Sequence, residues 1–308
     1  MKMFVFTKRL IKKISAFFLP FWKIFLKFGY WLASFLKPKW RWYGWKFLWY
    51  LRQWAHPPIH ILGRPQYAVA TYRDFKLMVN LSEMTGGNLY YGRPGLDEYE
   101  LDFLARFVRP GNIVFDIGAN IGVYTLVFAK TAGNSGKVFS FEPVSSNFNL
   151  LSKNMELNQI TNAELHNLAL SDHVGVSEIF LNSQSGLSSF ITTEYGTVFG
   201  TEKVRHTTLD KFVEKQNLHK LDFIKIDAEG WEEYILKGTA HILKKFKPAL
   251  FVELNPKNIK HQSMPLNDII KWLQDFGYKS YCINRRTQQL DFIGAIKDNY
   301  EGINFLFQ

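Results

Sequence analysis

The stretch VFDIGANIGVYT, residues 114–125, decides the fold of this chain. Its apolar start predicts a buried strand that ends in Asp116, and Gly118, Asn120 and Gly122 then lead into a helix. Small residues at such a turn let the backbone approach a bound nucleotide closely. The stretch therefore predicts a strand, a turn and a helix that together form a nucleotide site.

A second acid strengthens this prediction. Glu142 ends the next predicted strand, 20 residues after Gly122, where a carboxylate can accept hydrogen bonds from both hydroxyls of a ribose. Asp116 precedes the first glycine and would repel the pyrophosphate of a dinucleotide. A cationic ligand without phosphate suits this site better. The residues therefore favour S-adenosylmethionine over NAD as the cofactor.

Asp172 follows the third predicted strand, and two interpretations of it stay open. Its carboxylate could accept a hydrogen bond from an adenine amino group, which would make it a third acid of the cofactor site. It could equally serve as a turn residue before Gly175, a role that aspartate often has.

Strand and helix patterns alternate regularly around the opening stretch. This alternation predicts an α/β fold with a mostly parallel sheet and helices on both faces, in which ligands bind at the carboxyl ends of the strands. The predicted strands lie at residues 112–117, 137–141, 163–169, 222–226, 249–254, 278–284, 291–296 and 302–307, with a hairpin across 174–208. The predicted helices lie at residues 97–108, 121–131, 145–159, 232–246 and 265–276.

The second polar group is FIKIDAEGWE, residues 223–232, at the end of the fourth strand of the alternation. Lys225 and Asp227 share one face of that strand because side chains alternate with a period of two, and Glu229 follows just beyond it. Carboxylates and an ammonium group are costly to bury unless they pair or act chemically. We therefore predict that these three residues are catalytic. The alternative is that Glu229 only caps the following helix.

A divalent metal shared by Asp227 and Glu229 is conceivable, but the sequence shows no third ligand. His206 and Glu253 are guesses for that place. The prediction is therefore a site without metal, in which a carboxylate acts as the base.

Composition restricts the class of protein. With 308 residues, 47% of them hydrophobic and 21% charged, the chain is globular rather than disordered. The single cysteine, Cys282, excludes an intramolecular disulfide, and there is no CxxC motif or His/Cys cluster of the kind that holds structural zinc. We expect a cytoplasmic protein.

The N-terminal arm, residues 1–58, differs from the body, residues 59–308. Residues 1–55 hold twelve basic residues and no acid, which leaves 26 basic against 27 acidic residues in the rest of the chain. On a helical wheel, residues 8–28 place Lys and Arg on one face and Phe, Trp, Leu and Ile on the other. Such a helix lies in the membrane interface. We therefore predict that residues 1–55 attach the protein peripherally to an anionic membrane surface.

The arm has other possible roles. Its apolar stretches, 14–22 and 28–36, are shorter than the roughly 18 residues of a spanning helix, and the arm lacks the small residues of a signal cleavage site. The arm could pack on its own domain. It could also bind nucleic acid, although its continuous apolar face would then stay exposed to water.

The ordered motifs PGNIVFDIGANIGVYT, FSFEP, NLALSD, GLSSF, TTLDKF and IKIDAEGWE resemble the FkbM family of S-adenosylmethionine-dependent methyltransferases, over residues 85–255. This resemblance implies a class I Rossmann-like methyltransferase fold and methyl transfer to a hydroxyl group, often of a sugar or a polyketide. It also implies cofactor roles for the positions that match the glycine-rich and ribose motifs: Asp116, Gly118, Asn120, Gly122 and Glu142. The arm lies outside the resemblance.

The sequence thus predicts an O-methyltransferase in which Asp227 or Glu229 accepts the hydroxyl proton and Lys225 orients the pair. The expected acceptor is a small hydroxyl compound, a glycan or a lipid-linked molecule, because a membrane tether raises the effective concentration of such a substrate. Three alternatives remain: an NAD-dependent oxidoreductase, a catalytically inert membrane-associated scaffold, and a nucleic-acid methyltransferase.

Overall fold

A computed structural model gives the structure of the chain. It describes residues 24–25, 28–29, 32, 66–91, 98–183, 188–190, 197–255, 263–284, 289–294 and 304–308. The chain divides into two compact units, residues 1–96 and 97–308. The predicted arm lies outside the described residues apart from five positions, so the predicted domain boundary after residue 58 stays a prediction.

From residue 66 to residue 91 the first unit is a hairpin followed by a helix. β1 (Tyr67–Tyr72) and β2 (Phe75–Asn80) pair antiparallel, and the alternation of β2 buries Phe75, Leu77 and Val79. The helix α4 (Met84–Tyr91) was not predicted, because the two glycines inside it weaken the helical pattern. Among the described residues, no helix combines the length and the apolar character that crossing a membrane requires.

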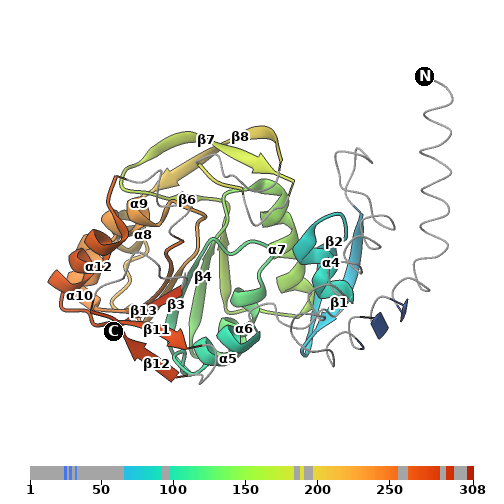
Figure 1. Cartoon of the computed structure of the whole chain (residues 1–308), viewed down its shortest axis with the longest axis horizontal. Helices are drawn as coiled ribbons and strands as arrows, with labels where there is room; N and C mark the ends of the chain where they lie inside the picture. The colour runs from blue at the N-terminus through green and yellow to red at the C-terminus, as the bar shows by residue number, and fades with distance from the viewer. Residues whose placement is uncertain are drawn as a thin grey trace. The chain divides into compact units, whose positions relative to one another are not determined.

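The second unit is built on a mixed sheet. Its described strands have the order β12-β11-β13-β10-β9-β3-β4-β5 (Figure 1). The run from β10 to β5 is parallel, whereas β13 is antiparallel to both β10 and β11. The bounds are β3 (Ile113–Ile117), β4 (Lys137–Phe141), β5 (Ala163–His166), β9 (Phe223–Ile226), β10 (Ala249–Glu253), β11 (Ser280–Asn284), β12 (Gln289–Phe292) and β13 (Asn304–Phe307). The predicted mostly parallel sheet is confirmed.

The order of the strands reverses between β3 and β9. From β3 the chain moves to β4 and β5 on one side, and it later returns to β9 and β10 on the other side of β3. Ligands of open α/β sheets bind beyond the carboxyl ends of the strands at such a switch point. Because β3 and β9 pair in parallel, Asp116 lies directly beside Lys225 at that place.

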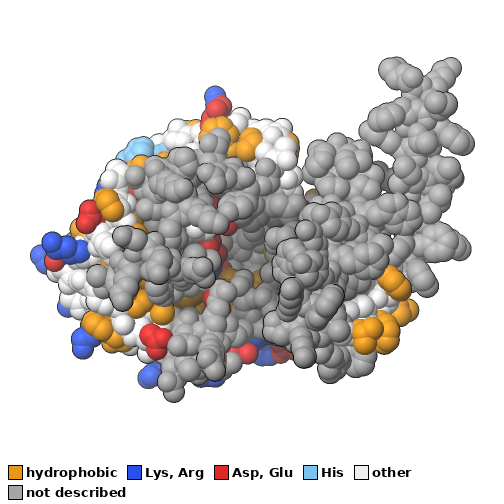
Figure 2. Space-filling model, viewed as in Figure 1, with side chains coloured by type: hydrophobic (Ala, Val, Ile, Leu, Met, Phe, Trp, Pro, Cys, Tyr) orange, Lys and Arg blue, Asp and Glu red, His pale blue; other side chains and the backbone are white. Residues whose placement is uncertain are grey.

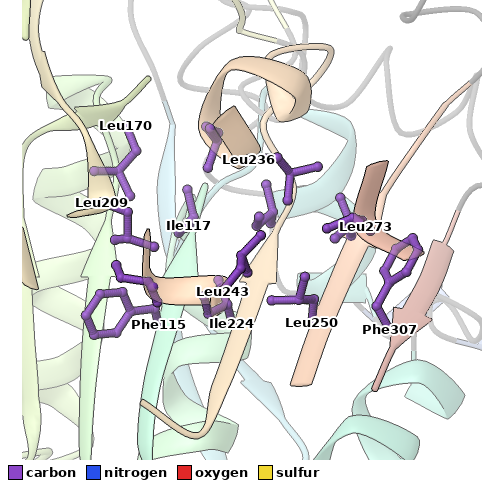
Figure 3. Packing of buried hydrophobic residues seen from close by; sticks show 14 of the residues in the cluster. Phe115, Ile117, Leu170, Leu209, Ile224, Leu236, Leu243, Leu250, Leu273 and Phe307 are labelled. Carbon is purple, nitrogen blue, oxygen red and sulfur yellow. The ribbon is translucent and has the colours of Figure 1, made fainter. Parts of the chain in front are cut away.

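Helices cover both faces of this sheet. On one face, α8 (Leu209–Lys215), α9 (Glu232–Lys237), α10 (Ala240–Phe246) and α12 (Leu266–Asp275) pack on Phe115, Ile117, Ile224 and Leu250 (Figure 3). On the other face, α5 (Glu98–Ala105) and α6 (Val123–Ala132) pack on Val114 and its neighbours, and α7 (Ser145–Leu157) lies against β5. The period of two along β3 thus sends Asp116 to the α6 face.

The structure corrects two predicted elements and adds a helix that was not predicted. The strand predicted at 163–169 is two strands, β5 and β6 (Ala169–Leu170), and β6 belongs to a separate sheet with the hairpin of β7 (Gly175–Asn182) and β8 (Val198–Thr207). The hairpin itself is confirmed. The helix predicted at 232–246 breaks into α9 and α10 at Gly238, which packs so tightly that a Cβ there would lie 2.0 Å from the carbonyl oxygen of Ser171. Helix α8, capped by Thr208, was not predicted.

Candidate active site

A buried lysine joins carboxylates from two neighbouring strands. Nζ of Lys225 on β9 donates a hydrogen bond to Oδ2 of Asp227 at 3.1 Å and lies 3.7 Å from Oδ1 of Asp116 on β3. The ammonium group also lies 4.7 Å from the centre of the Tyr124 ring, at the start of α6. The side chain of Lys225 is only 2% exposed. Burial lowers the pKa of Lys225, but Asp227 and Asp116 outweigh this effect and raise it, so the lysine is charged.

Asp116 is enclosed by helix α6. Its Oδ2 accepts a hydrogen bond of 2.6 Å from Oγ1 of Thr125, which in turn lies 2.9 Å from Oγ of Ser140 on β4. Oδ1 has no hydrogen-bond partner among the described residues. Burial raises the pKa of Asp116, although Lys225 and Thr125 oppose this effect. The carboxylate is therefore held at the carboxyl end of β3 by the helix that follows it.

Three carboxylates meet at the next position along the sheet. The register that pairs Ile226 with Val252 brings Asp227, just after β9, beside Glu253 at the end of β10. Carboxylate oxygens of Asp227, Glu229 and Glu253 lie within 4.8 Å of one another. Burial and the negative charge of Asp227 raise the pKa of Glu253 well above its usual range. Burial acts in the same direction on Asp227, but Lys225 and a hydrogen bond with Glu253 lower the pKa of that carboxyl.

The loop after β9 is shaped by Glu232. Its Oε1 accepts hydrogen bonds of 3.0 Å from the backbone N–H groups of both Ala228 and Gly230. This closes a tight turn in which Glu229 has a φ of 50° and Gly230 a φ of 100°. Burial raises the pKa of Glu232 to about 7, although these hydrogen bonds oppose that shift. The N-cap of α9 is Trp231, so Glu229 does not occupy the capping position.

A second segment contacts the same loop. Oγ of Ser189 donates a hydrogen bond of 2.7 Å to the carbonyl oxygen of Glu229. The neighbouring Phe190 ring lies 4.6 Å from Trp231, which stacks on Tyr234 at 4.1 Å. The described residues 188–190 thus lie against the loop that carries Glu229.

The glycines of the opening stretch are needed for packing. Gly118 has a φ of 76°, and a Cβ there would lie 1.8 Å from the carbonyl oxygen of Asp227. Gly122 has a φ of 92° and is the N-cap of α6, where a Cβ would approach Leu151 to 2.6 Å. These positions accept only glycine because the β3 turn touches the loop after β9 and the side chains of α7. From the sequence, these glycines were attributed to the close approach of a bound nucleotide. Their packing against the loop after β9 and against α7 was not predicted.

Glu142 is tied to the same turn. Its Oε2 accepts a hydrogen bond of 2.9 Å from the backbone N–H of Asn120, and its Oε1 accepts one of 3.0 Å from Val144. Burial raises the pKa of Glu142 to about 7, against these hydrogen bonds. Oδ1 of Asn120 is buried without a hydrogen-bond partner in the described part of the chain. Carboxylate lone pairs and an unused amide oxygen are acceptors that suit the hydroxyls and the ammonium group of an adenosyl cofactor.

Two residues named from the sequence lie in the small sheet. Asp172 follows β6, and its Oδ1 lies 2.6 Å from Nδ1 of His173 and accepts a bond from Ser171. His206 on β8 contacts Oγ of Ser177 at 3.0 Å through Nε2. Of the two guesses for a third metal ligand, Glu253 therefore joins Asp227 and Glu229, whereas His206 has partners in the small sheet.

The charge of the site is negative. Within the described residues, Lys225 is the basic group that contacts Asp116 and Asp227, while Glu229 adds a further carboxylate. An unbalanced negative site favours a cationic ligand. The carboxylates of Asp227, Glu229 and Glu253 are close enough to bind a divalent ion, but Asp227 already forms an ion pair with the ammonium group of Lys225. The prediction of a site without metal therefore stays a prediction.

Comparisons with known proteins agree with this geometry. The profile of the methyltransferase FkbM domain matches residues 116–280, more than half of the chain. Methyltransferase 1 of Beauveria bassiana is 23% identical over 41% of this chain and 58% of its own length. The tRNA (adenine(58)-N(1))-methyltransferase catalytic subunit TRM61 of Yarrowia lipolytica is 31% identical over 25% of this chain and 20% of its own. Hexuronic acid methyltransferase AglP of Haloferax volcanii is 25% identical over 61% of this chain and 72% of its own. The chain thus spans less than two thirds of the first two relatives.

Proposed function

This chain belongs to the FkbM methyltransferase family, and we propose that it is an O-methyltransferase acting on a hydroxyl of a sugar, a glycan or a lipid-linked acceptor at a membrane surface. S-adenosylmethionine is the cofactor that this family uses. The observation that carries the proposal is the ion pair between the buried Lys225 and the partly exposed Asp227, which lies at the switch point of the sheet. A charged pair at that place suits chemistry on a ligand better than it suits stability.

The cofactor site in this proposal consists of Asp116, Gly118, Asn120, Gly122 and Glu142, with Asp172 as a further candidate. When bound, S-adenosylmethionine supplies an electrophilic methyl group on a sulfonium centre. The excess of carboxylates suits the positive charge of such a ligand. Glu142 would accept from the ribose hydroxyls. Asn120, whose Oδ1 has no partner in the described residues, would supply one further acceptor.

In the proposed reaction, Asp227 accepts the proton of the acceptor hydroxyl. Its pKa is lowered by Lys225, so the carboxylate is ionised and ready to take a proton at neutral pH. Lys225 holds Oδ2 in place at 3.1 Å. Glu229, whose carboxylate shares the cluster, is the second candidate for this base. Positioning of the acceptor next to such a base accounts for much of the catalysis expected in this chemistry.

A sugar is the acceptor class that we favour. Of the three relatives reported above, the one that matches over the largest share of this chain, 61%, is named as a hexuronic acid methyltransferase. The twelve basic residues and the apolar face of residues 1–55 favour a peripheral membrane location, which would place the enzyme beside lipid-linked or envelope glycans. Cytoplasmic residence with attachment through the arm is part of this proposal.

An RNA acceptor is the rival, because one relative is named as a tRNA methyltransferase subunit. Binding of RNA relies on lysine and arginine contacts with phosphate. After residue 55 the chain holds 26 basic and 27 acidic residues, so the body has no basic excess. On the face seen in Figure 2, the visible basic side chains lie scattered towards the edge, and some of them lie next to acidic ones. These features favour the sugar.

Calorimetry on the full chain tests the cofactor first. We expect micromolar binding of S-adenosylmethionine and no binding of NAD, because Asp116 disfavours a pyrophosphate. Methyl transfer to glucuronic acid, as a soluble hexuronic acid, then tests the acceptor. Folded protein that binds neither cofactor would point to an inert scaffold. RNA binding that weakens steeply with salt would instead favour the nucleic-acid methyltransferase.

A further inference from the structure

Glu253 is the residue of the carboxylate cluster that the proposed reaction leaves without a role. It ends β10, next to Asp227 on one side, and it pairs in register with Asn304 of β13 on the other. The amide of Asn304 donates to both carboxylate oxygens of Glu100 on α5 at 3.0 Å. Glu253 thus lies between the proposed base and a buried polar pair.

The charged groups that face Glu253 are mostly acids. From the β9 side these are Asp227, Glu229 and Glu232. Burial raises the pKa of Glu253 most, and these three acids raise it further. Lys225 attracts Glu253 electrostatically, but its ammonium group already donates a hydrogen bond to Asp227. A fourth ionised carboxylate at this place would therefore meet repulsion without a nearby positive charge of its own.

The carboxyl groups of Glu253 and Asp227 lie close together. Their oxygens belong to a cluster in which all lie within 4.8 Å of one another. Two ionised carboxylates at such a distance repel each other, and a proton held by one of them removes the repulsion. Asp227 is the one that Lys225 stabilises as an anion, which leaves Glu253 as the acid.

We propose that Glu253 is a positioning residue: as a neutral carboxylic acid it donates a hydrogen bond to Asp227 and, with Lys225, fixes the carboxylate that receives the proton of the acceptor. This inference rests on the proposed function, in which Asp227 is the base. Two donors on one carboxylate restrict its rotation. The hydroxyl proton of the acceptor then moves to Asp227, while Glu253 keeps its own proton throughout.

The protonation state can be observed without an acceptor. We would label the full-length protein with ¹³C at the glutamate and aspartate side-chain carboxyls and record NMR spectra between pH 4 and 9. The signal lost in Glu253→Gln identifies Glu253, and Glu178→Gln, at an exposed position of β7, is the matched control for indirect changes. We expect Glu253 to remain a neutral acid at pH 6, where an ordinary glutamate with a pKa of about 4.3 is ionised. An ionised Glu253 at pH 6 overturns the proposal.

Variants separate the hydrogen bond from a merely structural contact. Asp227→Asn removes the neighbouring negative charge, so the titration of Glu253 should move to lower pH. Glu253→Gln keeps a donor and should leave the titration of Asp227 in place, whereas Glu253→Leu should move it to higher pH. If Glu253→Leu does not fold, the titrations of Glu253→Gln and Asp227→Asn still test whether the two carboxyl groups are hydrogen-bonded. The proposal is contradicted if the titrations of Glu253 and Asp227 are the same in these variants as in wild type. It is also contradicted if micromolar Mn²⁺ broadens the Glu253 signal, because the carboxylate would then bind a metal ion.

Catalysis gives a second readout with glucuronic acid as acceptor. Glu253→Gln should keep methyl transfer within about threefold of wild type, and Glu253→Leu should lose about tenfold or more in kcat with unchanged S-adenosylmethionine affinity. Equal loss in both variants overturns the positioning role. No transfer by the wild type, together with the expected titrations, refutes the proposed acceptor and leaves the pair of carboxyl groups standing.

Discussion

Nζ of Lys225 lies 3.1 Å from Oδ2 of Asp227, and the same nitrogen is 3.7 Å from Asp116 on the neighbouring strand. One buried cation therefore balances carboxylates from both sides of the switch point. The parallel register of β3 and β9 produces this contact, because it pairs Asp116 with Lys225. Pairing of these two strands therefore also brings the charged groups of the site together.

Replacement of Lys225 by methionine should be costly. The variant leaves the buried carboxylate of Asp116 and the partly buried one of Asp227 without their cation, and breaking a buried pair typically costs about 3–5 kcal/mol. Urea unfolding at pH 7.5 measures the loss. Lys220→Met is the matched control, since Lys220 is 56% exposed and pairs with Asp222 at the surface, where such pairs contribute about 1 kcal/mol at most. Equal losses in the two variants would show that Lys225 does not stabilise the buried carboxylates.

Asp227→Asn should separate binding from chemistry. The amide keeps the size of the side chain but cannot accept a proton, so we expect turnover to fall by about two orders of magnitude or more. The affinity for S-adenosylmethionine should stay close to that of wild type in calorimetry. Glu229→Gln is the companion variant, because it tests the other candidate base. An unchanged rate for Asp227→Asn would remove this residue from the chemistry.

Gly118→Ala should be far more damaging than Gly111→Ala. Both glycines have positive φ, 76° and 85°, so both variants carry the strain of a side chain at positive φ, about 1–2 kcal/mol. Only the first meets an obstacle, the Asp227 carbonyl oxygen at 1.8 Å, whereas the atom nearest to a Cβ at the second would be Oγ of Ser135, at an ordinary contact distance of 3.6 Å. Thermal unfolding of the two variants measures the difference. Similar melting temperatures would mean that the turn can move away from the loop after β9.

The sequence was sufficient for the elements with strong local patterns. β3, β4 and β9 are continuous apolar runs, and their predicted strands differ from the observed ones by at most one residue at an end. It was insufficient where tertiary contacts decide. The Gly238 break depends on a backbone contact with Ser171, and the separation of β6 from β5 depends on pairing with a strand more than 30 residues later.

The candidate site, too, was predictable where the sequence pattern is local and not where tertiary contacts decide. Asp116, Lys225 and Asp227 were named as candidates because polar side chains at the ends of buried strands are conspicuous in a sequence. Glu253 has the same signal at the end of β10, but its role depends on the register that places it beside Asp227. Thr125 was missed as a partner of Asp116, since that hydrogen bond links a helix back to the preceding strand.

Glu232→Gln should change the pH dependence of stability. Burial raises the pKa of Glu232 from 4.5 to about 7, so between these values the folded state holds a proton that the unfolded state has lost. Rising pH therefore removes stability through this group, and the loss is complete above pH 7. Glutamine presents the same oxygen to Ala228 and Gly230 without charge. We expect the variant to equal wild type at pH 4.5 and to be more stable at pH 8.5, by up to about 3 kcal/mol. Unfolding curves at both pH values check this, and a constant difference would contradict it.

Residues 1–55 should attach the protein to an anionic membrane, a prediction that rests on the sequence alone. Each basic residue near an anionic surface contributes about 1 kcal/mol, and residues 1–55 hold twelve of them. The full chain should therefore sediment with phosphatidylserine vesicles, and less with neutral ones. Deletion of residues 1–55 should abolish sedimentation but preserve methyl transfer to soluble glucuronic acid. Replacement of Phe17, Phe18, Phe21 and Trp22 by serine keeps all twelve charges, so binding lost in this variant would assign the attachment to the apolar face as well. If the deletion also abolishes transfer and S-adenosylmethionine binding, the arm is part of the fold, because a tether that only raises the local concentration of substrate leaves both intact.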